Sequence, residues 1–345
     1  MKFNTKCVHG GGKPDSTGAI SPAIYMSSTF THPGLGETTG FQYTRESNPT
    51  RDRLETLIAG LEEGTDAIAF SSGMAAVDAV FHLFSPGDHV ILGDDLYGGS
   101  IRLFTNIYEK NGVEFTYVGT SDLDAVQAAF KPNTKAVYIE TPTNPMMEIT
   151  DVRALSKMAH DRNALVIVDN TFLSPYFQKP LNLGADIVVH SGTKFIGGHH
   201  DVISGFTIVK DDELAAQLRL IYKTVGACLS AFDSWLVIRG VKTLALRMEQ
   251  HQKNAIALAE WLKNEPKVTK VLFPGLPEHP GYEINKSQTT GFGGMLSFEV
   301  DSEATAKQVL EGIQLIQFAE SLGGTESLLT YPVTQTHPDL KPEDA

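Results

Sequence analysis

Residues 165–169, Leu-Val-Ile-Val-Asp, and residues 186–194, Asp-Ile-Val-Val-His-Ser-Gly-Thr-Lys, place polar groups directly after short runs of β-branched residues. Apolar runs of this length predict buried strands of a parallel sheet. In an open α/β sheet, ligands bind beyond the carboxyl ends of the parallel strands. The residues that follow these two runs are therefore the first candidates for a functional site.

The same alternation of short apolar runs and stretches of helical period extends from about residue 50 to residue 210. It predicts a mostly parallel, seven-stranded sheet with helices on both faces. The expected strands are Ala67–Phe70, His89–Leu92, Glu114–Val118, Ala136–Glu140, Leu165–Asp169, Asp186–His190 and Gly205–Val209, and the expected helices are Arg51–Leu61, Ile101–Lys110, Leu123–Phe130 and Asp151–Asp161.

The regions on either side of this pattern have a different character. The first 45 or so residues show little periodicity and predict an extended arm. A long helix over Ser234–Asn264 is expected to lead into strands near Val268–Phe273 and Met295–Val300 and a helix over Glu303–Gly312. We therefore predict an arm over residues 1–50 that contacts a neighbouring subunit, a large domain over 51–240 and a smaller α/β domain over 241–345.

Composition narrows the class of function. The 345 residues have a formal net charge of -13, which argues against a nucleic-acid partner. No apolar stretch approaches the roughly 20 residues of a membrane span, and Met1–Cys7 lacks the apolar core of a signal peptide, so we expect a cytoplasmic protein. The two cysteines, Cys7 and Cys228, are too far apart for a CxxC metal site and are not expected to be catalytic.

Three polar features after the predicted strands complement one another. Asp169 at the end of a buried strand needs a cation or several donors. Ser71-Ser-Gly-Met74 precedes a helical pattern, where backbone N–H groups can hold a phosphate. Lys194 lies near the hydroxyls of Ser191 and Thr193. Taken singly, Asp169 could be a capping acid, Ser71–Met74 an ordinary turn and Lys194 a surface lysine. Together they offer a carboxylate, a phosphate-binding turn and an amine, which are the three groups that pyridoxal phosphate requires.

Two other segments have competing interpretations. Tyr97 is followed by Gly98 and Gly99, which leave one ring face uncovered, so stacking on a planar ligand is favoured over a role in the core. His199-His200-Asp201 suggests a metal site, but adjacent side chains of an extended segment point apart. A polar loop is the favoured interpretation there, and no metal is expected.

Taken as a set, the motifs along the chain resemble the Cys/Met-metabolism family of pyridoxal-phosphate enzymes, over nearly the whole chain. The resemblance implies the fold-type-I architecture. The motifs that carry it are Tyr43-Thr-Arg-Glu-Ser-Asn-Pro-Thr50, Ser71-Ser-Gly-Met-Ala-Ala76, Asp95-Leu-Tyr-Gly-Gly99, Glu140-Thr-Pro-Thr-Asn-Pro145, Val168-Asp-Asn-Thr-Phe172, His190-Ser-Gly-Thr-Lys-Phe-Ile-Gly-Gly198 and Ala319-Glu-Ser-Leu-Gly-Gly-Thr-Glu-Ser327.

The resemblance also implies a role for individual residues. Lys194 would hold the cofactor as a Schiff base and take a proton from the substrate, and Asp169 would pair with the pyridinium nitrogen. Tyr43 and Arg45 would reach the phosphate of a neighbouring subunit, which implies a homodimer or homotetramer with shared sites. Tyr97 would stack on the ring and assist proton transfer, and Asn144 would lie near the ring hydroxyl and the substrate. The other implied positions are Gly73, Met74, Ser191 and Thr193 at the phosphate, and Arg102 and Ser321 in the substrate pocket.

The expected substrates are small sulfur amino acids, and Glu320 bears on the choice of reaction. In the γ-acting members of the family a glutamate commonly precedes this serine, where it could meet the distal ammonium of cystathionine; a solvated acid is the alternative. The segment Thr330–His337 also resembles γ-synthases, whereas Thr325 replaces a common Val, Phe or Tyr. We expect γ-synthase or γ-lyase chemistry, with a β-lyase, an aminotransferase and a non-catalytic cofactor-binding regulator as alternatives.

The family's usual final segment contains an arginine that binds the substrate α-carboxylate. The sequence printed here reaches Ala345 without that segment. If the protein itself lacks it, we expect substrate affinity to collapse while cofactor binding survives.

Overall fold

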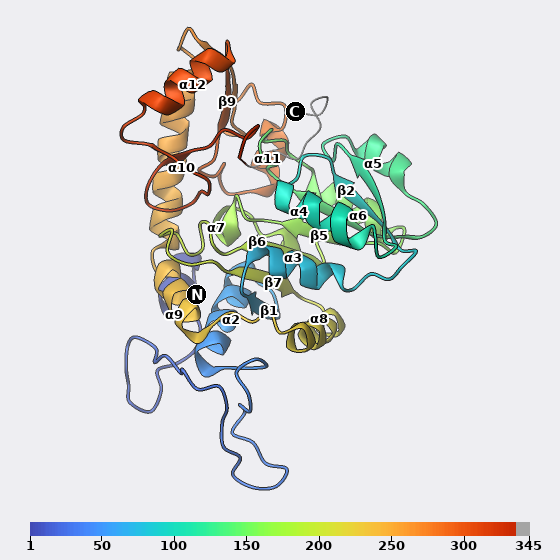
Figure 1. Cartoon of the computed structure of the whole chain (residues 1–345), viewed down its shortest axis with the longest axis vertical. Helices are drawn as coiled ribbons and strands as arrows, with labels where there is room; N and C mark the ends of the chain where they lie inside the picture. The colour runs from blue at the N-terminus through green and yellow to red at the C-terminus, as the bar shows by residue number, and fades with distance from the viewer. Residues whose placement is uncertain (336–345) are drawn as a thin grey trace.

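A seven-stranded sheet lies at the centre of the chain (Figure 1). The structure, a computed structural model, describes residues 1–335. The predicted sheet is confirmed, and its strands lie within two residues of the expected limits. Their bounds are β1 (Asp66–Phe70), β2 (His89–Gly93), β3 (Glu114–Val118), β4 (Thr134–Glu140), β5 (Leu165–Asp169), β6 (Ile187–Ser191) and β7 (Gly205–Val209).

Helices connect the strands, and several begin at a polar cap. Asn48 accepts a hydrogen bond from the N–H of Thr50, just before a helix with proline in its first turn. The helices are α1 (Phe3–His9), α2 (Pro49–Glu62), α3 (Gly73–Phe81), α4 (Gly98–Leu103), the π-helix η1 (Phe104–Tyr108), α5 (Leu123–Ala129), α6 (Val152–His160), α7 (Ser174–Phe177), the 3₁₀ turn η2 (Pro180–Asn182), α8 (Asp212–Val225), α9 (Ala231–Val241), α10 (Leu244–Leu262), α11 (Tyr282–Gln288) and α12 (Glu303–Gly312).

The direction of the strands brings their ends to one edge. The order is β1-β7-β6-β5-β4-β2-β3, and β2 to β6 pair in parallel. β7 is antiparallel to both β6 and β1, so β1 runs in the same direction as β6. The carboxyl ends of β1, β2, β4, β5 and β6 therefore meet at one edge of the sheet.

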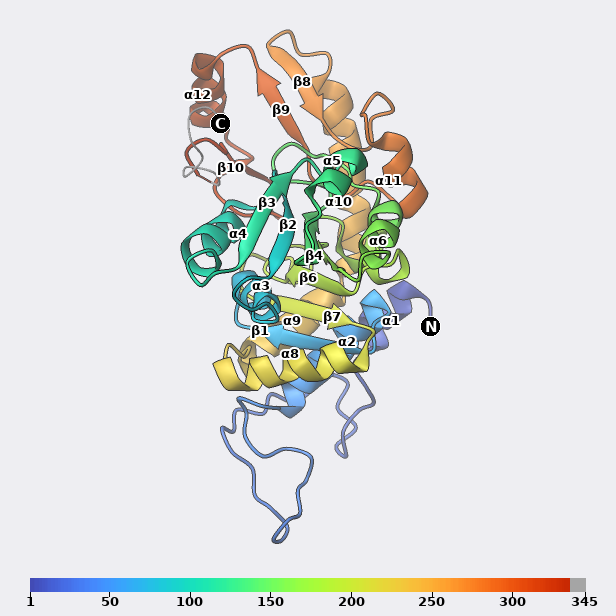
Figure 2. The same ribbon diagram turned by 90° about the vertical axis from the view of Figure 1, so that its right-hand side faces the viewer.

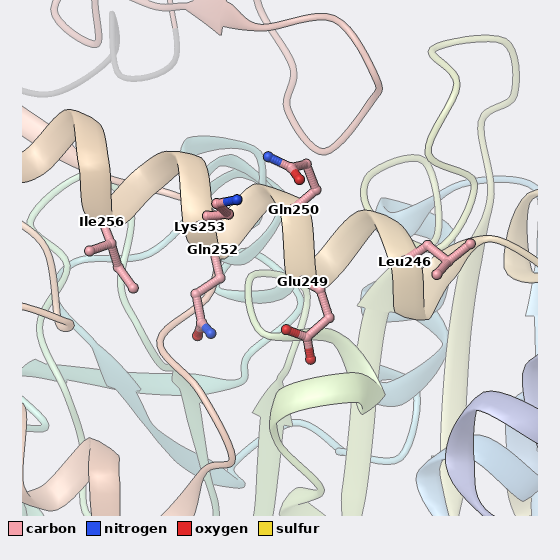
Figure 3. A pocket seen from close by; sticks show the side chains of 6 residues that line it. All are labelled: Leu246, Glu249, Gln250, Gln252, Lys253 and Ile256. Atoms are coloured by element: carbon pink, nitrogen blue, oxygen red, sulfur yellow. The ribbon is translucent and has the colours of Figure 1, made fainter.

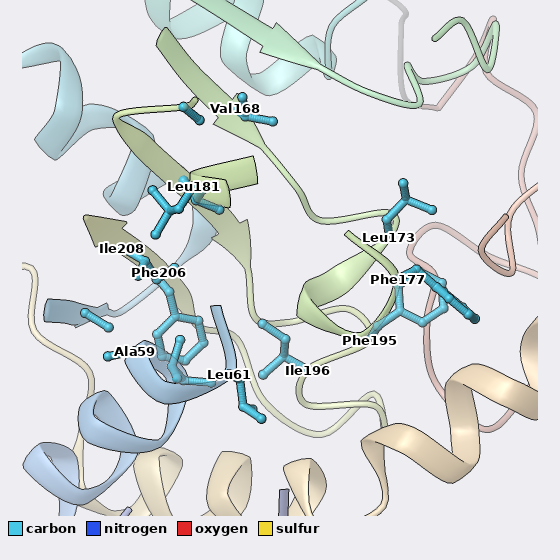
Figure 4. Packing of buried hydrophobic residues seen from close by; sticks show 14 of the residues in the cluster. Ala59, Leu61, Val168, Leu173, Phe177, Leu181, Phe195, Ile196, Phe206 and Ile208 are labelled. Atoms are coloured by element: carbon cyan, nitrogen blue, oxygen red, sulfur yellow. The ribbon is translucent and has the colours of Figure 1, made fainter. Parts of the chain in front are cut away.

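Both faces of the sheet are buried under helices. Side chains of β5 alternate, with Val166 and Val168 packed in the cluster on the α2 and α6 face and Ile167 in the cluster on the α3 and α8 face. Figure 4 shows the first cluster around Val168 and Phe206. Burial on both sides explains why these strands are continuous apolar runs.

A smaller set of elements follows the C-terminal end of α10 and lies at the top of Figure 2. Strand β8 (Val268–Leu272) pairs antiparallel with β9 (Ser297–Val300), and α12 packs against β9. Two short parallel strands, β10 (Gln317–Phe318) and β11 (Leu328–Leu329), follow. The expected strands and helix are present here, and the domain boundary at residue 240 stays a prediction.

The prediction of a single long helix over residues 234–264 is wrong. The chain forms α9 and α10 instead, separated at Lys242 and Thr243. The N–H of Thr243 closes a tight turn on the carbonyl of Gly240, which also accepts a hydrogen bond from Arg247 Nη2 at 3.0 Å. A β-carbon on Gly240 would lie 2.2 Å from the carbonyl oxygen of Gly197, so this site also depends on close backbone packing.

The expected N-terminal arm is only partly extended. Residues 3–9 form α1, which packs against α2 and α10 and buries Cys7. The aperiodic sequence that follows forms long loops projecting below α8 and α9 in Figures 1 and 2. The helix was missed because it is short. Within residues 1–335, no helix is long and apolar enough to cross a membrane.

Candidate active site

Lys194 lies in the loop directly after β6, on the edge where the strand ends meet. Its Nζ donates a hydrogen bond to Ser321 Oγ at 2.9 Å, although the two residues are 127 positions apart. Burial lowers the pKa of Lys194, and the negative charge of Glu320 acts in the opposite direction. The structure thus brings Lys194, Glu320 and Ser321 together, as the sequence analysis expected.

The turn that contains Ser321 packs directly on the loop that follows β6 and contains Lys194 and Phe195, here called the lysine loop. Gly323 has φ 81°, and a β-carbon there would lie 2.5 Å from the backbone nitrogen of Phe195. A β-carbon on Gly324 would lie 2.1 Å from Nε2 of His200. Glycine at position 323 therefore lets the turn approach the backbone of Lys194 and Phe195 closely, and glycine at position 324 leaves room for the His200 ring.

Asp169 ends β5 and points to the same face of the sheet as Ile167. Its Oδ1 accepts the N–H of Thr171 at 3.0 Å, and the phenol of Tyr138 donates to Oδ2 at 3.4 Å. Burial raises the pKa of Asp169, while the donors of Thr171 and the charge of His190 oppose that rise. The carboxyl therefore has several stabilising partners for its charged form.

Gly73 and Ser191 lie together at the start of α3, whereas Thr193, two residues after Ser191, exchanges hydrogen bonds with Ser204. Ser72 caps this helix by accepting the N–H of Ala75 at 3.0 Å. A β-carbon on Gly73 would lie 2.9 Å from Cβ and 3.0 Å from Oγ of Ser191, so the helix start faces the loop that leads to Lys194. Met74 is half-buried in the same turn. Gly73, Met74 and Ser191 therefore lie at the helix start where the sequence analysis predicts a phosphate-binding turn.

Tyr97 precedes α4, after β2, and its side chain is 42% exposed. The backbone N–H of Tyr97 donates to Glu140 Oε2 at 3.1 Å. A β-carbon on Gly99 would lie 2.4 Å from the Tyr97 ring, so a larger residue would displace the ring. Asn144 follows β4 at the same edge and is half-buried, whereas Arg102 lies in α4 with an exposed side chain.

Tyr43 and Arg45 lie in the arm and contact other parts of the chain. Tyr43 is 45% exposed and forms an isolated bridge with Thr29. Arg45 donates to the carbonyl of Lys223 at the end of α8, and its guanidinium carbon lies 5.5 Å from the centre of the Tyr43 ring. The described contacts of these two residues do not include Lys194 or Asp169.

Two further features lie outside this group. His199 Nδ1 donates to the carbonyl of Gly197, and residues 1–335 contain no cluster of three metal-ligating side chains. A shallow pocket of about 370 Å³ opens on α10, where Glu249 and Gln252 already bond to Tyr176 and Phe292 (Figure 3). Its lining residues are Leu246, Glu249, Gln250, Gln252, Lys253 and Ile256.

A family model described as "Cys/Met metabolism PLP-dependent enzyme" matches residues 4–345. The chain belongs to this family. Its cofactor is pyridoxal phosphate, and the chain is an enzyme of sulfur amino-acid metabolism. The expectation drawn from the motifs is therefore confirmed at the level of family, fold and cofactor.

Relatives within the family differ in their named activities. The chain is 49% identical to a cystathionine beta-lyase of Lactococcus lactis subsp. cremoris over 99% of this chain and 90% of the relative. It is 50% identical to a cystathionine gamma-synthase of Haemophilus influenzae over 98% of this chain and 88% of the relative. A crystal structure of cystathionine gamma-lyase from Lactobacillus plantarum with L-serine superposes with TM-score 0.98 at 47% identity, covering 100% and 90% of the two chains.

The residues at the sheet edge fit the cofactor of this family. The helix start at Gly73 is bare and bordered by the Ser191 hydroxyl, which suits a phosphate. Asp169 can hold a positive charge on a ring nitrogen, and the half-buried amine of Lys194 can meet an aldehyde. The site thus offers one group for each part of pyridoxal phosphate.

The structure adds residues to this edge that were not singled out in the sequence. Glu140 accepts a hydrogen bond from the backbone of Tyr97. Thr171 and Tyr138, the latter on β4, both donate hydrogen bonds to Asp169. Glu140 ends a buried strand as Asp169 does, so the same strand-end rule could have identified it. Of the segment Thr330–His337, the last two residues lie outside the described residues.

Proposed function

We propose that this enzyme makes or breaks a C–S bond at the γ-carbon of cystathionine or O-acylhomoserine-type substrates, as a γ-synthase or γ-lyase. The observation that carries the proposal is the position of Glu320, whose charge acts on Lys194. A carboxylate beside the reacting lysine can attract the distal ammonium of cystathionine. The names of the relatives do not separate the reactions, because their identities are nearly equal.

The roles of individual residues form part of the same proposal. Lys194 would hold the cofactor covalently and Asp169 would pair with its ring nitrogen. Tyr97 would stack on the ring, and Asn144 would contact the ring hydroxyl and substrate. The remaining contacts would be made by Gly73, Met74, Ser191 and Thr193 at the phosphate and by Arg102, Glu320 and Ser321 in the substrate pocket.

Proton transfer would be the task of Lys194. When bound, pyridoxal phosphate supplies a sink for the electrons released at the substrate α-carbon. The Nζ of Lys194 would accept the α-proton, and the burial that lowers its pKa favours the neutral, basic form. Loss of a γ-substituent requires a second proton, from the β-carbon, and Ser321 would keep Nζ within reach of both carbons.

A product assay tests the reaction. The enzyme is incubated with cystathionine, and separately with O-acylhomoserine plus cysteine. Formation of 2-oxobutyrate and cysteine, or of new cystathionine, supports the proposal. Formation of pyruvate and homocysteine as the main products would instead identify a β-lyase, which stays the second candidate because a relative of that name is 49% identical.

Two variants test the proposed part of Glu320. Glu320→Ala should raise KM for cystathionine about tenfold, equivalent to about 1.4 kcal/mol, without weakening cofactor binding. Glu326→Ala is the matched control, because Glu326 is an exposed acid in the same turn. If Glu320→Ala weakens cofactor binding as much as it raises KM for cystathionine, the basis for γ-chemistry is removed.

A separate experiment tests the position of the cofactor. Borohydride reduction followed by peptide mapping should label Lys194, and a label on another residue would overturn the site assignment.

We also propose a homodimer, or a pair of dimers, with shared sites. The arm supports this, because it leaves Ile20, Met26 and Leu35 more than 70% exposed and includes Tyr43 and Arg45. Mixing inactive Lys194→Ala subunits with inactive Arg45→Ala subunits should restore activity, since one site of each mixed dimer would contain both native residues. No restoration, with mixed dimers demonstrated by native mass spectrometry, would exclude shared sites.

The cytoplasm is our proposed compartment. Cys7 and Cys228 are both free thiols, which is typical of proteins from a reducing environment. Cell fractionation tests this, and recovery of the enzyme outside the cytoplasmic fraction would contradict it.

A further inference from the structure

Glu140 is an acid inside the candidate active site to which no role has yet been given. It is the last residue of β4 and is only 6% exposed. In the parallel pairing of β4 with β5 it stands directly opposite Asp169. Both side chains point to the face that contains Tyr138 and Ile167, so two carboxyl groups lie side by side on strands about 4.8 Å apart.

The surroundings of Glu140 oppose a negative charge. Its Oε2 accepts one hydrogen bond, from the backbone N–H of Tyr97 at 3.1 Å. The charged groups that act on it, Asp169 on β5 and Asp95 in the loop before Tyr97, are both acids. Burial and these charges raise the pKa of Glu140 well above its usual range.

Asp169 has a different environment, although it is the neighbour of Glu140. It accepts the N–H of Thr171 at 3.0 Å and a hydrogen bond from Tyr138 at 3.4 Å, and His190 on β6 also favours its ionised form. Two adjacent carboxyl groups in a buried site retain one proton between them. The donors around Asp169 assign that proton to Glu140.

The position of Glu140 also connects it with Tyr97. The hydrogen bond between them is the direct link from the end of β4 to the segment that starts α4. A neutral carboxylic acid still accepts this bond through its carbonyl oxygen. Glu140 can therefore hold the Tyr97 backbone without adding a second negative charge beside Asp169.

We infer that Glu140 is a positioning residue that stays protonated in the working enzyme, holds Tyr97 in place and leaves Asp169 as the single anion of the pair. The inference rests on the proposed roles of Asp169 and Tyr97 at the cofactor. It assigns Glu140 no contact with substrate. Its importance lies in the charge of Asp169, which would be partly neutralised if the two acids shared the proton equally.

Infrared spectroscopy of the holoenzyme tests the protonation state. At pH 7 the wild-type enzyme should show the C=O stretch of a buried carboxylic acid, and Glu140→Gln should lose that band. Glu109→Gln is the control, because Glu109 is exposed and should leave the band unchanged. A band that persists in Glu140→Gln but disappears in Asp169→Asn would place the proton on Asp169 and overturn the inference, as would absence of the band in wild type.

Cofactor spectroscopy tests the positioning role. Glu140→Gln keeps a neutral acceptor for the Tyr97 N–H, so the pH titration of the bound cofactor's visible absorption should match wild type. Glu140→Ala removes the acceptor and should weaken cofactor binding at least tenfold and alter the circular dichroism of the cofactor band. A shifted titration in Glu140→Gln, or equal cofactor affinity in Glu140→Gln and Glu140→Ala, would overturn the inference.

These outcomes can be separated from failure of the proposed function. If the cofactor does not bind, or if borohydride labels a residue other than Lys194, the site assignment itself is wrong. If Lys194 is labelled in every variant and the infrared band is absent from wild type, only the role of Glu140 is wrong. Should Glu140→Ala not fold, the wild-type and Glu140→Gln spectra still decide the protonation state.

Discussion

Lys194 Nζ donates to Ser321 Oγ across 2.9 Å, joining the loop after β6 to a turn near the end of the described chain. Ser321 has φ 103°, a left-handed value that residues other than glycine rarely adopt. Gly323 packs on the backbone of Lys194 and Phe195 in the same turn. Any change that moves this turn will therefore also move the lysine.

Loss of the Ser321 hydroxyl should slow the reaction without releasing the cofactor. A side-chain hydrogen bond contributes about 0.5–1.5 kcal/mol, so Ser321→Ala should reduce kcat up to about tenfold. The pH profile of kcat should shift as well, because the hydroxyl contacts the proposed base. Ser327→Ala is the control, since Ser327 is exposed in the same turn. An unchanged kcat and pH profile in Ser321→Ala would show that the hydrogen bond has no part in catalysis.

A methyl group at Gly73 should weaken cofactor binding. The added β-carbon would lie 2.9 Å from Cβ of Ser191, so the helix start and the lysine loop would have to separate. We expect Gly73→Ala to raise the cofactor Kd at least tenfold, about 1.4 kcal/mol, as measured by equilibrium dialysis.

The control for Gly73 is a glycine in a helix with free space around it. A β-carbon at Gly60 in α2 meets nothing within 4 Å. Gly60→Ala should leave the cofactor Kd unchanged and increase the free energy of unfolding by about 0.5–1 kcal/mol. Equal cofactor Kd values for Gly73→Ala and Gly60→Ala would argue against a phosphate site at α3.

Arg247 should stabilise the loop after Lys194. It is 9% exposed, and its guanidinium donates to the carbonyl oxygens of Phe195 at 2.6 Å and Gly240 at 3.0 Å. The Gly240 carbonyl keeps the N–H of Thr243 as a donor, whereas the Phe195 carbonyl loses the guanidinium. A buried carbonyl left without a donor costs about 1–3 kcal/mol, so Arg247→Ala should lower the free energy of unfolding by about 1–3 kcal/mol in urea titrations. Arg239→Ala, on the exposed side of α9, should change it by less than about 0.5 kcal/mol.

Cys7 should make stability fall at alkaline pH. Burial raises the pKa of its thiol to about 11, compared with about 8.5 in an unfolded chain. The folded state therefore keeps a proton that the unfolded state loses. The resulting stability is complete below about pH 8.5 and is lost as the pH rises through 11, an effect of about 3 kcal/mol.

Urea unfolding of wild type and Cys7→Ala between pH 8 and pH 11 measures this contribution. The difference in the free energy of unfolding between wild type and Cys7→Ala should shrink as the pH rises. Cys228→Ala serves as the control, because Cys228 is only half-buried. In the native enzyme at pH 8, iodoacetamide should modify Cys228 before Cys7. A constant difference across this pH range would mean that the Cys7 thiol ionises equally in both states.

The repeating pattern of strands and the polar residues at their ends could be predicted from sequence, because both are local. Leu165–Asp169 alternates over two buried faces, and Ser191–Lys194 follows the next strand directly, so the strand-end rule predicted their proximity. The motifs around these residues were sufficient to predict the family and its cofactor.

Other features depend on segments that meet only in the folded chain. The pairing of Glu140 with Asp169 requires the strand order, and the bond from Lys194 to Ser321 requires the path of the last turn. The break between α9 and α10 was missed because helical period persists through it, whereas the turn depends on where the carbonyl of Gly240 finds its donors.

The sequence by itself therefore determined which residue types stand at the strand ends and which lysine follows them. Only the tertiary structure decided which of those groups are neighbours, how deeply each is buried and which donors it receives. Those three quantities determine whether Glu140 or Asp169 keeps the proton, because desolvation and neighbouring charges act through space and not along the chain.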